Sequence, residues 1–364
     1  MNGTLHSYWR DLASGNRTRT GDTFFLLFLT PLAWLYSSAL RLRAQLFKRG
    51  VLKTYRLSRA VVSIGNITVG GTGKTPVTAY IARFLLSEGL RVAVLSRGYG
   101  GSLEGQTCVV SDGTTVMLRS EECGDEPYLL ATTIPGLMVV IGPDRYTAGQ
   151  MAFQQLSPDI FLLDDGFQHL RLYRNLNILL QDFTRPFGNG LTLPAGILRE
   201  PASAARRADL TIFTRTPQTA LVPANTGKSP HCLSRHKLAD LLPLTGGTPI
   251  SFTECLDKKA LVFAGIADPD SFFEGLRVEG LTVVRCLNFP DHSVYNRERC
   301  AEIAEAFRES GADVLITTEK DGVKLTGLSP ELASRTLLAR LDLTIDNPEL
   351  LKNMLIKLVQ DYTA

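Results

Sequence analysis

Short, continuous apolar runs recur through the first part of the chain, separated by amphipathic or polar stretches. Runs without polar alternation are typical of strands buried on both faces of a parallel sheet. We therefore predict strands at Ala60–Ile64, Val92–Leu95, Leu137–Ile141, Ile160–Leu163, Leu176–Leu180 and Leu210–Phe213. The stretches between most of them are helical or long loops, so the sequence predicts an α/β fold with helices on both faces of the sheet.

A second alternation of the same kind fills the C-terminal part of the chain. It predicts strands at Ala260–Ala264, Leu281–Leu287, Val314–Thr317 and Leu337–Leu343, and helices at Pro269–Val278, Arg297–Ser310 and Pro348–Asp361. Between the two alternations, Thr216–Ser251 is rich in Pro, Thr, Gly and Ser, which is typical of a linker or a hairpin-like connection. We expect two α/β lobes, the second smaller, with a cleft between them.

The N-terminal region carries a different pattern, because Thr23–Leu40 contains no charged residue. This length is the lower limit for a helix that spans a bilayer, and Pro31 would kink such a helix. Basic residues follow at once, at Arg41, Arg43, Lys48, Arg49, Lys53 and Arg56, and favour a cytoplasmic position for the rest of the chain. We predict a membrane-associated helix that spans the bilayer or lies in its interface. A buried core helix is the alternative.

Composition narrows the classes of protein. The 364 residues are enough for two domains, and 39 basic against 36 acidic residues give a net charge of +3. That charge is too small for an obligate nucleic-acid binder. The six cysteines form no C-x-x-C pair or metal-ligand spacing, which fits core thiols in a reduced compartment.

The strand predicted at Ala60–Ile64 leads into a glycine-rich turn and then an apolar helical pattern, which is the context of a phosphate-binding loop (P-loop). The candidate nucleotide-binding residues are Thr68, Val69, Gly70, Gly71, Thr72, Gly73, Lys74 and Thr75. Lys74 would reach the β- and γ-phosphates, and the Thr75 hydroxyl would bind Mg²⁺. Thr68 stands where the common motif has its first glycine. A glycine-rich turn that binds nothing is the alternative.

A second motif, formed by two consecutive aspartates, follows the strand predicted at Ile160–Leu163. Asp164 and Asp165 would lie at the carboxyl end of that strand, where open α/β sheets place their ligands. Adjacent strand residues face opposite ways, so one carboxylate would hold Mg²⁺, directly or through water, and the other would orient groups around it. A simple turn cap is the alternative.

Several blocks together resemble the tetraacyldisaccharide 4'-kinase family. They are Thr68-Val-Gly-Gly-Thr-Gly-Lys-Thr75, Ser96-Arg-Gly-Tyr-Gly-Gly101, Gly124-Asp-Glu-Pro127, Gly142-Pro-Asp-Arg145, Asp164-Asp-Gly-Phe-Gln-His169, Leu193-Pro-Ala-Gly196, Leu198-Arg-Glu-Pro201, Phe289-Pro-Asp-His292 and Thr318-Glu-Lys-Asp321. Thr68 fits this family's pattern. Ser293 stands where the family often has a second histidine, so we assign that position no essential role.

The resemblance implies a membrane-bound kinase of lipid A biosynthesis that uses ATP and Mg²⁺. It would transfer the γ-phosphoryl group to the 4'-hydroxyl of a tetraacylated glucosamine disaccharide 1-phosphate. That acceptor lies in the bacterial inner membrane, so the catalytic domains would face the cytoplasm, with no obligate protein partner and no nucleic acid. We divide the chain into an anchor region (1–45), a P-loop NTPase-like kinase core (46–215), a linker (216–258) and a second α/β lobe (259–364).

The candidate catalytic residues are Asp125, His292, Lys74 and Arg145. The family implies a dyad in which His292 tunes or orients the Asp125 carboxylate as a base for the attacking hydroxyl. Arg145 could stabilise the γ-phosphoryl group or hold the sugar phosphate, or could be a solvated arginine that opens a helix. Asp125 could equally be a helix cap, and His292 a loop histidine bonded to backbone.

Other basic and polar candidates stay open. Arg97 and Arg199, in glycine- or proline-flanked loops, could grip the substrate phosphate, and Glu319 and Lys320 could contact adenine or pack the lobes together. His169 is more plausible as a structural residue within its turn.

The P-loop switch ATPases of the partitioning and targeting type are an alternative to the kinase. Those proteins carry a signature lysine early in the loop, where this chain has Thr68-Val69. A metallochaperone-type GTPase would need the guanine-reading motif N-K-x-D, which the sequence lacks. The sequence therefore favours the kinase.

Overall fold

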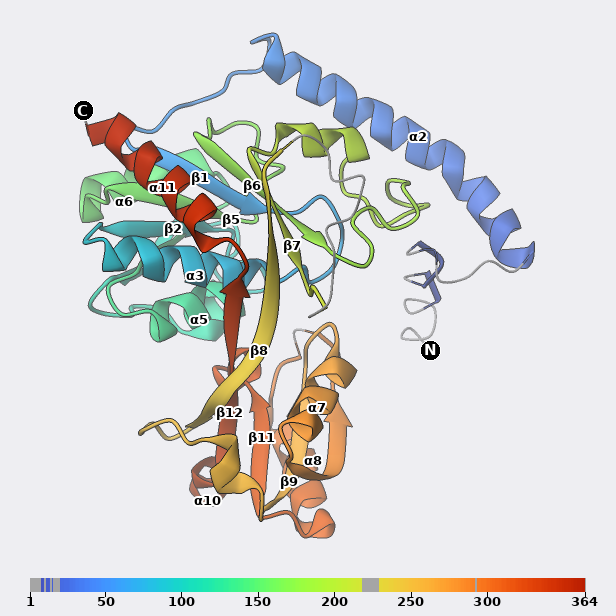
Figure 1. The fold of residues 1–364 in the computed structure, drawn as a ribbon, viewed down its shortest axis with the longest axis vertical. Coiled ribbons are helices and arrows are strands. Elements are labelled where there is room, and N and C mark those ends of the chain that lie inside the picture. The colour runs from blue at the N-terminus through green and yellow to red at the C-terminus, as the bar shows by residue number, and fades with distance from the viewer. Residues whose placement is uncertain are drawn as a thin grey trace.

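The computed structural model describes residues 8–9, 11–13, 15, 20–217, 229–291 and 293–363. Figure 1 shows two α/β lobes, joined by the long strands β8 and β12, with helix α2 along one side. In the described part of the chain, twelve strands form one sheet in the order β10-β9-β11-β12-β8-β7-β6-β1-β5-β2-β4-β3. The fold is a mixed α/β fold with a large, mainly parallel sheet.

The first lobe contains the six strands predicted for it. They are β1 (Ala60–Gly65), β2 (Val92–Ser96), β4 (Met138–Ile141), β5 (Ile160–Asp164), β6 (Leu176–Asp182) and β7 (Leu210–Thr214), and they pair in parallel. Strand β3 (Cys108–Asp112) was not predicted, and it pairs antiparallel with β4 at the sheet edge. Its short run ends in polar residues, so the sequence gives no strong strand signal.

Helices cover both faces of this sheet, as the sequence predicts. The helices are α3 (Lys74–Ser87), α4 (Ser120–Cys123), α5 (Asp125–Thr133) and α6 (Arg145–Leu156), and Ala202–Arg207 forms a 3₁₀ helix. Alternate residues of β1 divide between the two layers: Val62 belongs to the apolar cluster that contains Ile81 of α3, and Val61 to the cluster that contains Ala148 of α6. Because helices bury both faces of the sheet, its strands are uninterrupted apolar runs in the sequence.

The second lobe repeats this design on a smaller scale. It contains β9 (Lys259–Ala264), β10 (Thr282–Asn288) and β11 (Val314–Thr318), with α7 (Pro269–Val278), α8 (Arg297–Ser310), α9 (Glu319–Gly322) and α10 (Pro330–Ser334). The strands are parallel, with α7 and α8 in separate apolar clusters of the lobe. The predicted bounds of α7 and α8 are confirmed.

The predicted linker contains a strand that the sequence analysis did not foresee. Strand β8 (His231–Pro243) begins beside β7 in the first lobe and continues antiparallel to β12 (Thr336–Ile345) into the second lobe. Its first residues are buried, but most of its later residues are half-exposed because the strand crosses between two lobes. Apolar and polar residues therefore do not alternate regularly along β8, and the segment does not resemble a core strand in sequence.

The C-terminal helix also lies elsewhere than predicted. We assigned residues 259–364 to the second lobe, but α11 (Pro348–Thr363) packs on the first lobe (Figure 1). Its buried Leu351 and Leu355 join the apolar cluster that includes Val62 and Ile81. The helix returns because β12 carries the chain back along β8, and its apolar face then covers the first-lobe sheet.

Helix α2 (Thr20–Lys48) includes the uncharged segment and Pro31. The alternative of a buried core helix is wrong, because Phe28, Trp34 and Leu35 are 78%, 65% and 70% exposed. The opposite side contacts the protein through Ala33, whose carbonyl accepts a hydrogen bond from Thr192 Oγ1 at 2.8 Å. In the part of the chain that the structure describes, no helix combines the length and the apolar character needed to cross a membrane.

The position of α11 leads to a stability prediction. Leu355→Ala removes a fully buried side chain, so we expect the free energy of unfolding to fall by about 2–5 kcal/mol. Leu256→Ala, at a side chain that is 44% exposed, should cost clearly less. Denaturant unfolding of both variants is the measurement, and equal losses would contradict the docking of α11 on the core.

Candidate active site

The glycine-rich loop between β1 and α3 forms a strand–loop–helix turn, as the sequence predicts. Gly70 and Gly73 have positive φ angles of 106° and 74°, and Gly73 is the N-cap residue of α3. A Cβ on Gly73 would also lie 3.0 Å from His236 Cε1 of β8, so both the positive φ and this close approach favour glycine. Lys74 begins the helix, and the helix N-terminus provides a favourable site for phosphate.

The first half of the loop is paired with the segment around Leu198, which explains Thr68. Val69 N–H donates to Ile197 O and Arg199 N–H donates to Ile67 O, both at 2.7 Å. Thr68 forms an antiparallel bridge with Leu198, a conformation open to any residue, and its hydroxyl accepts a hydrogen bond from Asn66 Nδ2 at 3.2 Å. No glycine is needed at this position.

Asp164 ends β5 in a buried site. Its carboxylate accepts hydrogen bonds from Thr78 Oγ1 of α3 and Ser96 Oγ of β2, each at 3.4 Å. Burial, with the neighbouring charges of Glu126 and Asp165, raises the pKa of Asp164 to about 7, although Lys74 and Arg145 oppose the shift. A cation at this position would favour the ionised form.

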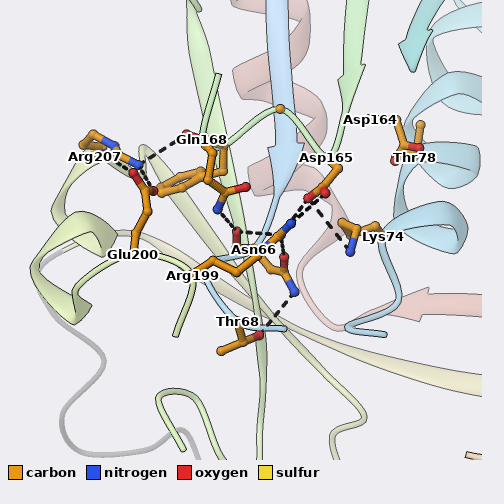
Figure 2. A network of polar contacts seen from close by, with 12 residues as sticks. Asn66, Thr68, Lys74, Thr78, Asp164, Asp165, Gln168, Arg199, Glu200 and Arg207 are labelled. Atoms are coloured by element: carbon orange, nitrogen blue, oxygen red, sulfur yellow. Dashed lines mark hydrogen bonds and ion pairs between the residues drawn. The ribbon is translucent and has the colours of Figure 1, made fainter. Parts of the chain in front are cut away.

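Asp165 has the opposite electrostatic setting and a left-handed backbone with φ of 52°. Arg199 donates two hydrogen bonds of 2.8 Å to its carboxylate, and Lys74 Nζ lies 3.9 Å away (Figure 2). Burial alone would raise the pKa of Asp165, but the Arg199 hydrogen bonds and the charges of Lys74, Arg199 and Arg145 outweigh it and lower the pKa. Asp165 is therefore a carboxylate at neutral pH.

Arg199 links this carboxylate to the start of the P-loop. Its guanidinium also donates to Asn66 O at 3.2 Å and to Asn66 Oδ1, while Gln168 Nε2 donates to Asn66 O at 2.5 Å. The adjacent Glu200 is buried and pairs with Arg207 (Figure 2). Arg199 was predicted as a possible grip for substrate phosphate, but it binds Asp165 and Asn66 in this structure.

The oxygen ligands proposed for Mg²⁺ have suitable chemistry. Asp164, Asp165 and Thr75 all line one cleft with Lys74. Within the described ranges, no cluster of three or more His, Cys, Asp or Glu side chains could hold a metal alone. Mg²⁺ commonly takes one or two carboxylates and completes its shell with water and substrate phosphates, so this donor set fits it.

Arg145 opens α6 but is not the solvated arginine of the alternative interpretation. It is only 5% exposed, and its guanidinium donates to Gly142 O at 2.6 Å. Burial lowers its pKa, while the charges of Asp164 and Asp165 oppose the shift. The helix is capped by Asp144, whose carboxylate accepts from Tyr146 N–H. Arg145 lines the same cleft as the two aspartates.

Asp125 lies in the first turn of α5, at the contact between the lobes. Lys324 Nζ of the second lobe lies 3.5 Å from its carboxylate, and Ser120 Oγ donates to Val323 O at 3.3 Å. The predicted partner of Asp125, His292, lies outside the described residues. The structure therefore gives no geometry for the dyad, which stays a prediction.

The remaining candidates, Arg97, His169, Glu319 and Lys320, all line the cleft, and they differ in burial and in their partners. Glu319 and Lys320 line the cleft from α9; burial raises the pKa of Glu319, and Lys320 Nζ lies 3.0 Å from Asp291. Arg97 is mostly exposed and pairs with Glu104. His169 lies 3.8 Å from Asp144, and burial lowers its pKa to about 4, in agreement with a structural role.

Three residues near the P-loop or Asp125 were not predicted from the sequence. Arg215 donates to Gly71 O at 2.9 Å, His236 occupies the space next to Gly73 that a Cβ would need, and Lys324 pairs with Asp125. None belongs to a phosphate-binding motif, and each comes from a segment distant in sequence. The only sequence feature that could have indicated a role in the site is the positive charge of Arg215 and Lys324.

The cleft that joins these residues has a volume of about 2790 Å³. The P-loop lines it, together with α7 of the second lobe and Tyr36, Leu40 and Arg43 of α2. Pockets for one small ligand occupy roughly 300–1,000 Å³. The cleft therefore has room for a nucleotide and a larger second substrate.

Comparisons with known proteins agree with this geometry. The family model described as tetraacyldisaccharide-1-P 4'-kinase matches residues 25–360. A tetraacyldisaccharide 4'-kinase of Pelobacter propionicus is 57% identical over 99% of this chain and 100% of its own length. One of Geobacter metallireducens is 53% identical over 84% of this chain and 90% of its own. A crystal structure of LpxK from Aquifex aeolicus in complex with ATP is 33% identical, with a TM-score of 0.77, over 90% of this chain and 98% of that one.

The Arg199 contacts lead to a binding prediction. Arg199→Met leaves Asp165 without its two hydrogen-bond donors, so the carboxylate loses its fixed orientation. We expect Mg²⁺–ATP affinity to fall at least about tenfold and ATP affinity without Mg²⁺ to change less. Isothermal titration calorimetry measures both, with Arg277→Met as the control, because the Arg277 side chain on α7 is 47% exposed. Equal affinity in all three proteins would show that Arg199 does not position Asp165.

Proposed function

This chain belongs to the tetraacyldisaccharide-1-P 4'-kinase family. We propose which residues of its cleft bind the phosphates, hold the metal and act on the reacting groups during phosphoryl transfer. The protein is an ATP-dependent kinase that phosphorylates the 4'-hydroxyl of a tetraacylated disaccharide 1-phosphate in lipid A biosynthesis. The observation that carries the assignment is the P-loop beside Asp165, in a cleft large enough for both substrates.

The transferring phosphoryl group carries negative charge that the site must balance. Lys74 at the N-terminus of α3 would contact the β- and γ-phosphates, and the backbone N–H groups of Gly70–Gly73 would surround them. Asp164, Asp165 and Thr75 would hold Mg²⁺, which supplies charge neutralisation to the phosphates when bound. Arg199 and Asn66 would keep the Asp165 carboxylate aimed at that position.

Arg145 and Asp125 would act on the reacting groups themselves. The buried guanidinium of Arg145, on the side of the cleft with Asp164 and Asp165, would stabilise charge on the γ-phosphoryl group. Asp125, with His292, would accept the proton of the attacking 4'-hydroxyl. The lobe contact at Asp125 supports this assignment, because it lets groups of both lobes reach one substrate.

The acceptor carries acyl chains, so the enzyme has to reach a lipid surface. We propose that α2 lies in the bilayer interface with Phe28, Trp34 and Leu35 buried among lipids, and that its basic C-terminal end faces anionic headgroups. Tyr36 and Arg43 of the same helix line the cleft, so the acceptor could enter directly from the membrane. The site would then lie on the cytoplasmic side of the bacterial inner membrane.

A substitution in the P-loop tests the proposed chemistry. Lys74→Ala removes a charge that is most important in the transition state, so kcat for phosphate transfer to the lipid acceptor should fall by about 10²-fold or more. Lys259→Ala, at an exposed lysine of the second lobe, is the control. The assay follows radiolabel from [γ-³²P]ATP into the lipid product. Near-normal transfer by folded Lys74→Ala, or label released only to water by the native enzyme, would contradict the proposal.

The membrane proposal has its own test in the exposed face of α2. The triple variant Phe28→Ser, Trp34→Ser and Leu35→Ser removes apolar side chains without touching the contact at Ala33. We expect at least tenfold weaker binding to phospholipid vesicles, since each buried side chain contributes roughly 1.5–3 kcal/mol. Co-sedimentation is the measurement, with Val278→Ser on α7 as the exposed apolar control. Unchanged binding of the triple variant would place the membrane contact elsewhere.

A further inference from the structure

Lys324 is a buried cation at the contact between the lobes, and no motif in the sequence singles it out. Its side chain is 7% exposed, and its Nζ lies 2.9 Å from Asp321 Oδ1 and 3.5 Å from Asp125 Oδ2. The Nζ also lies 5.3 Å from the centre of the Tyr295 ring. One cation therefore bridges two carboxylates, one from each lobe. Buried lysines are rare unless they are paired, and these two carboxylates provide the pairing.

The second lobe fixes the position of this cation. Asp321 is fully buried, and its Oδ2 accepts hydrogen bonds from Gly265 N–H at 2.8 Å and from Thr318 Oγ1 at 2.9 Å. Gly265 follows β9 and Thr318 is the last residue of β11, so the carboxylate is tied to the ends of two strands. Asp321 in turn holds Lys324 through their ion pair. The cation is therefore placed by the second-lobe sheet rather than by its own flexible side chain.

The first lobe presents Asp125 to this fixed cation. Asp125 lies in the first turn of α5, beside the short helix α4, and the Ser120 hydrogen bond to Val323 O brings the two segments together. The Asp125 side chain is 16% exposed and lines the same cleft as the P-loop. Attraction to a fixed cation limits the directions in which the carboxylate can point.

We propose that Lys324 is a positioning residue for the kinase reaction, which holds the Asp125 carboxylate toward the acceptor from the opposite lobe. The inference rests on the proposed role of Asp125 in the phosphoryl transfer. Lys324 is not one of the residues that line the cleft, whereas Asp125 is. Lys324 acts on the reaction through Asp125. The orientation of the Asp125 carboxylate therefore depends on contact between the lobes.

Kinetics of the full-length enzyme, with ATP, Mg²⁺ and the lipid acceptor in micelles, test this role. Lys324→Met keeps the aliphatic stem and removes the charge, so kcat should fall at least about tenfold while KM for ATP changes less than about threefold. Lys324→Arg keeps the charge and should recover a large part of the loss. Lys259→Met is the control at an exposed lysine of the same lobe. Turnover of Lys324→Met equal to that of the control overturns the proposal.

A double-mutant cycle separates positioning from general stability. If Lys324 acts through Asp125, adding Lys324→Met to Asp125→Asn should lower the residual kcat by less than about twofold. A merely structural lysine would lower it by the same factor in both backgrounds, and that result overturns the proposal. Melting temperatures of all variants report any folding defect.

Amide hydrogen exchange gives a readout that does not depend on activity. Loss of the interlobe ion pair should speed exchange in the first turns of α5 in Lys324→Met but not in Lys259→Met. Unchanged exchange in α5 overturns the positioning role. Failure of the native enzyme to phosphorylate the lipid acceptor would instead reject the proposed function, and the exchange data would still decide whether Lys324 holds α5.

Discussion

The antiparallel ladder between β8 and β12 is the constraint on which the rest of the molecule depends. Strand β8 is hydrogen-bonded to β7 at one end and to β12 along most of its length, so the sheet of the first lobe continues into the second. Backbone hydrogen bonds of this kind fix register and direction together. The ladder places His236 against the P-loop, returns α11 to the first-lobe core, and brings α9 and Lys324 over α5.

Within the cleft that this ladder creates, neighbouring carboxylates have different electrostatic roles. Asp164 is buried with hydroxyl donors, and its pKa is raised to about 7, whereas Arg199 and Lys74 lower the pKa of Asp165. Without a bound cation, Asp165 therefore releases its proton at a lower pH than Asp164. Three basic side chains, Lys74, Arg145 and Arg199, lie around them, which suits a polyphosphate ligand together with a divalent cation.

The sequence predicts those parts of the structure whose causes are local. Strands β1, β2 and β5 are apolar because both of their faces are buried, and the P-loop follows β1 because its glycines and Lys74 are consecutive. Strand β8 could not be predicted in this way, since it crosses between lobes and much of it is half-exposed. The partners of Asp125 and Asp165 were also inaccessible: Lys324 and Arg199 lie far away in sequence, and only the fold brings them close.

Two lobes joined by one ladder line a single cleft, and we propose that this cleft binds both ATP and the lipid hydroxyl. A crystal structure of the full chain with a non-hydrolysable ATP analogue, Mg²⁺ and the disaccharide acceptor tests it most directly. We expect the γ-phosphate at Lys74, the metal on the Asp164–Asp165 side, and the acceptor 4'-hydroxyl within hydrogen-bond distance of Asp125 or His292. An acceptor bound outside the cleft, or a 4'-hydroxyl reached by groups of only one lobe, would contradict it.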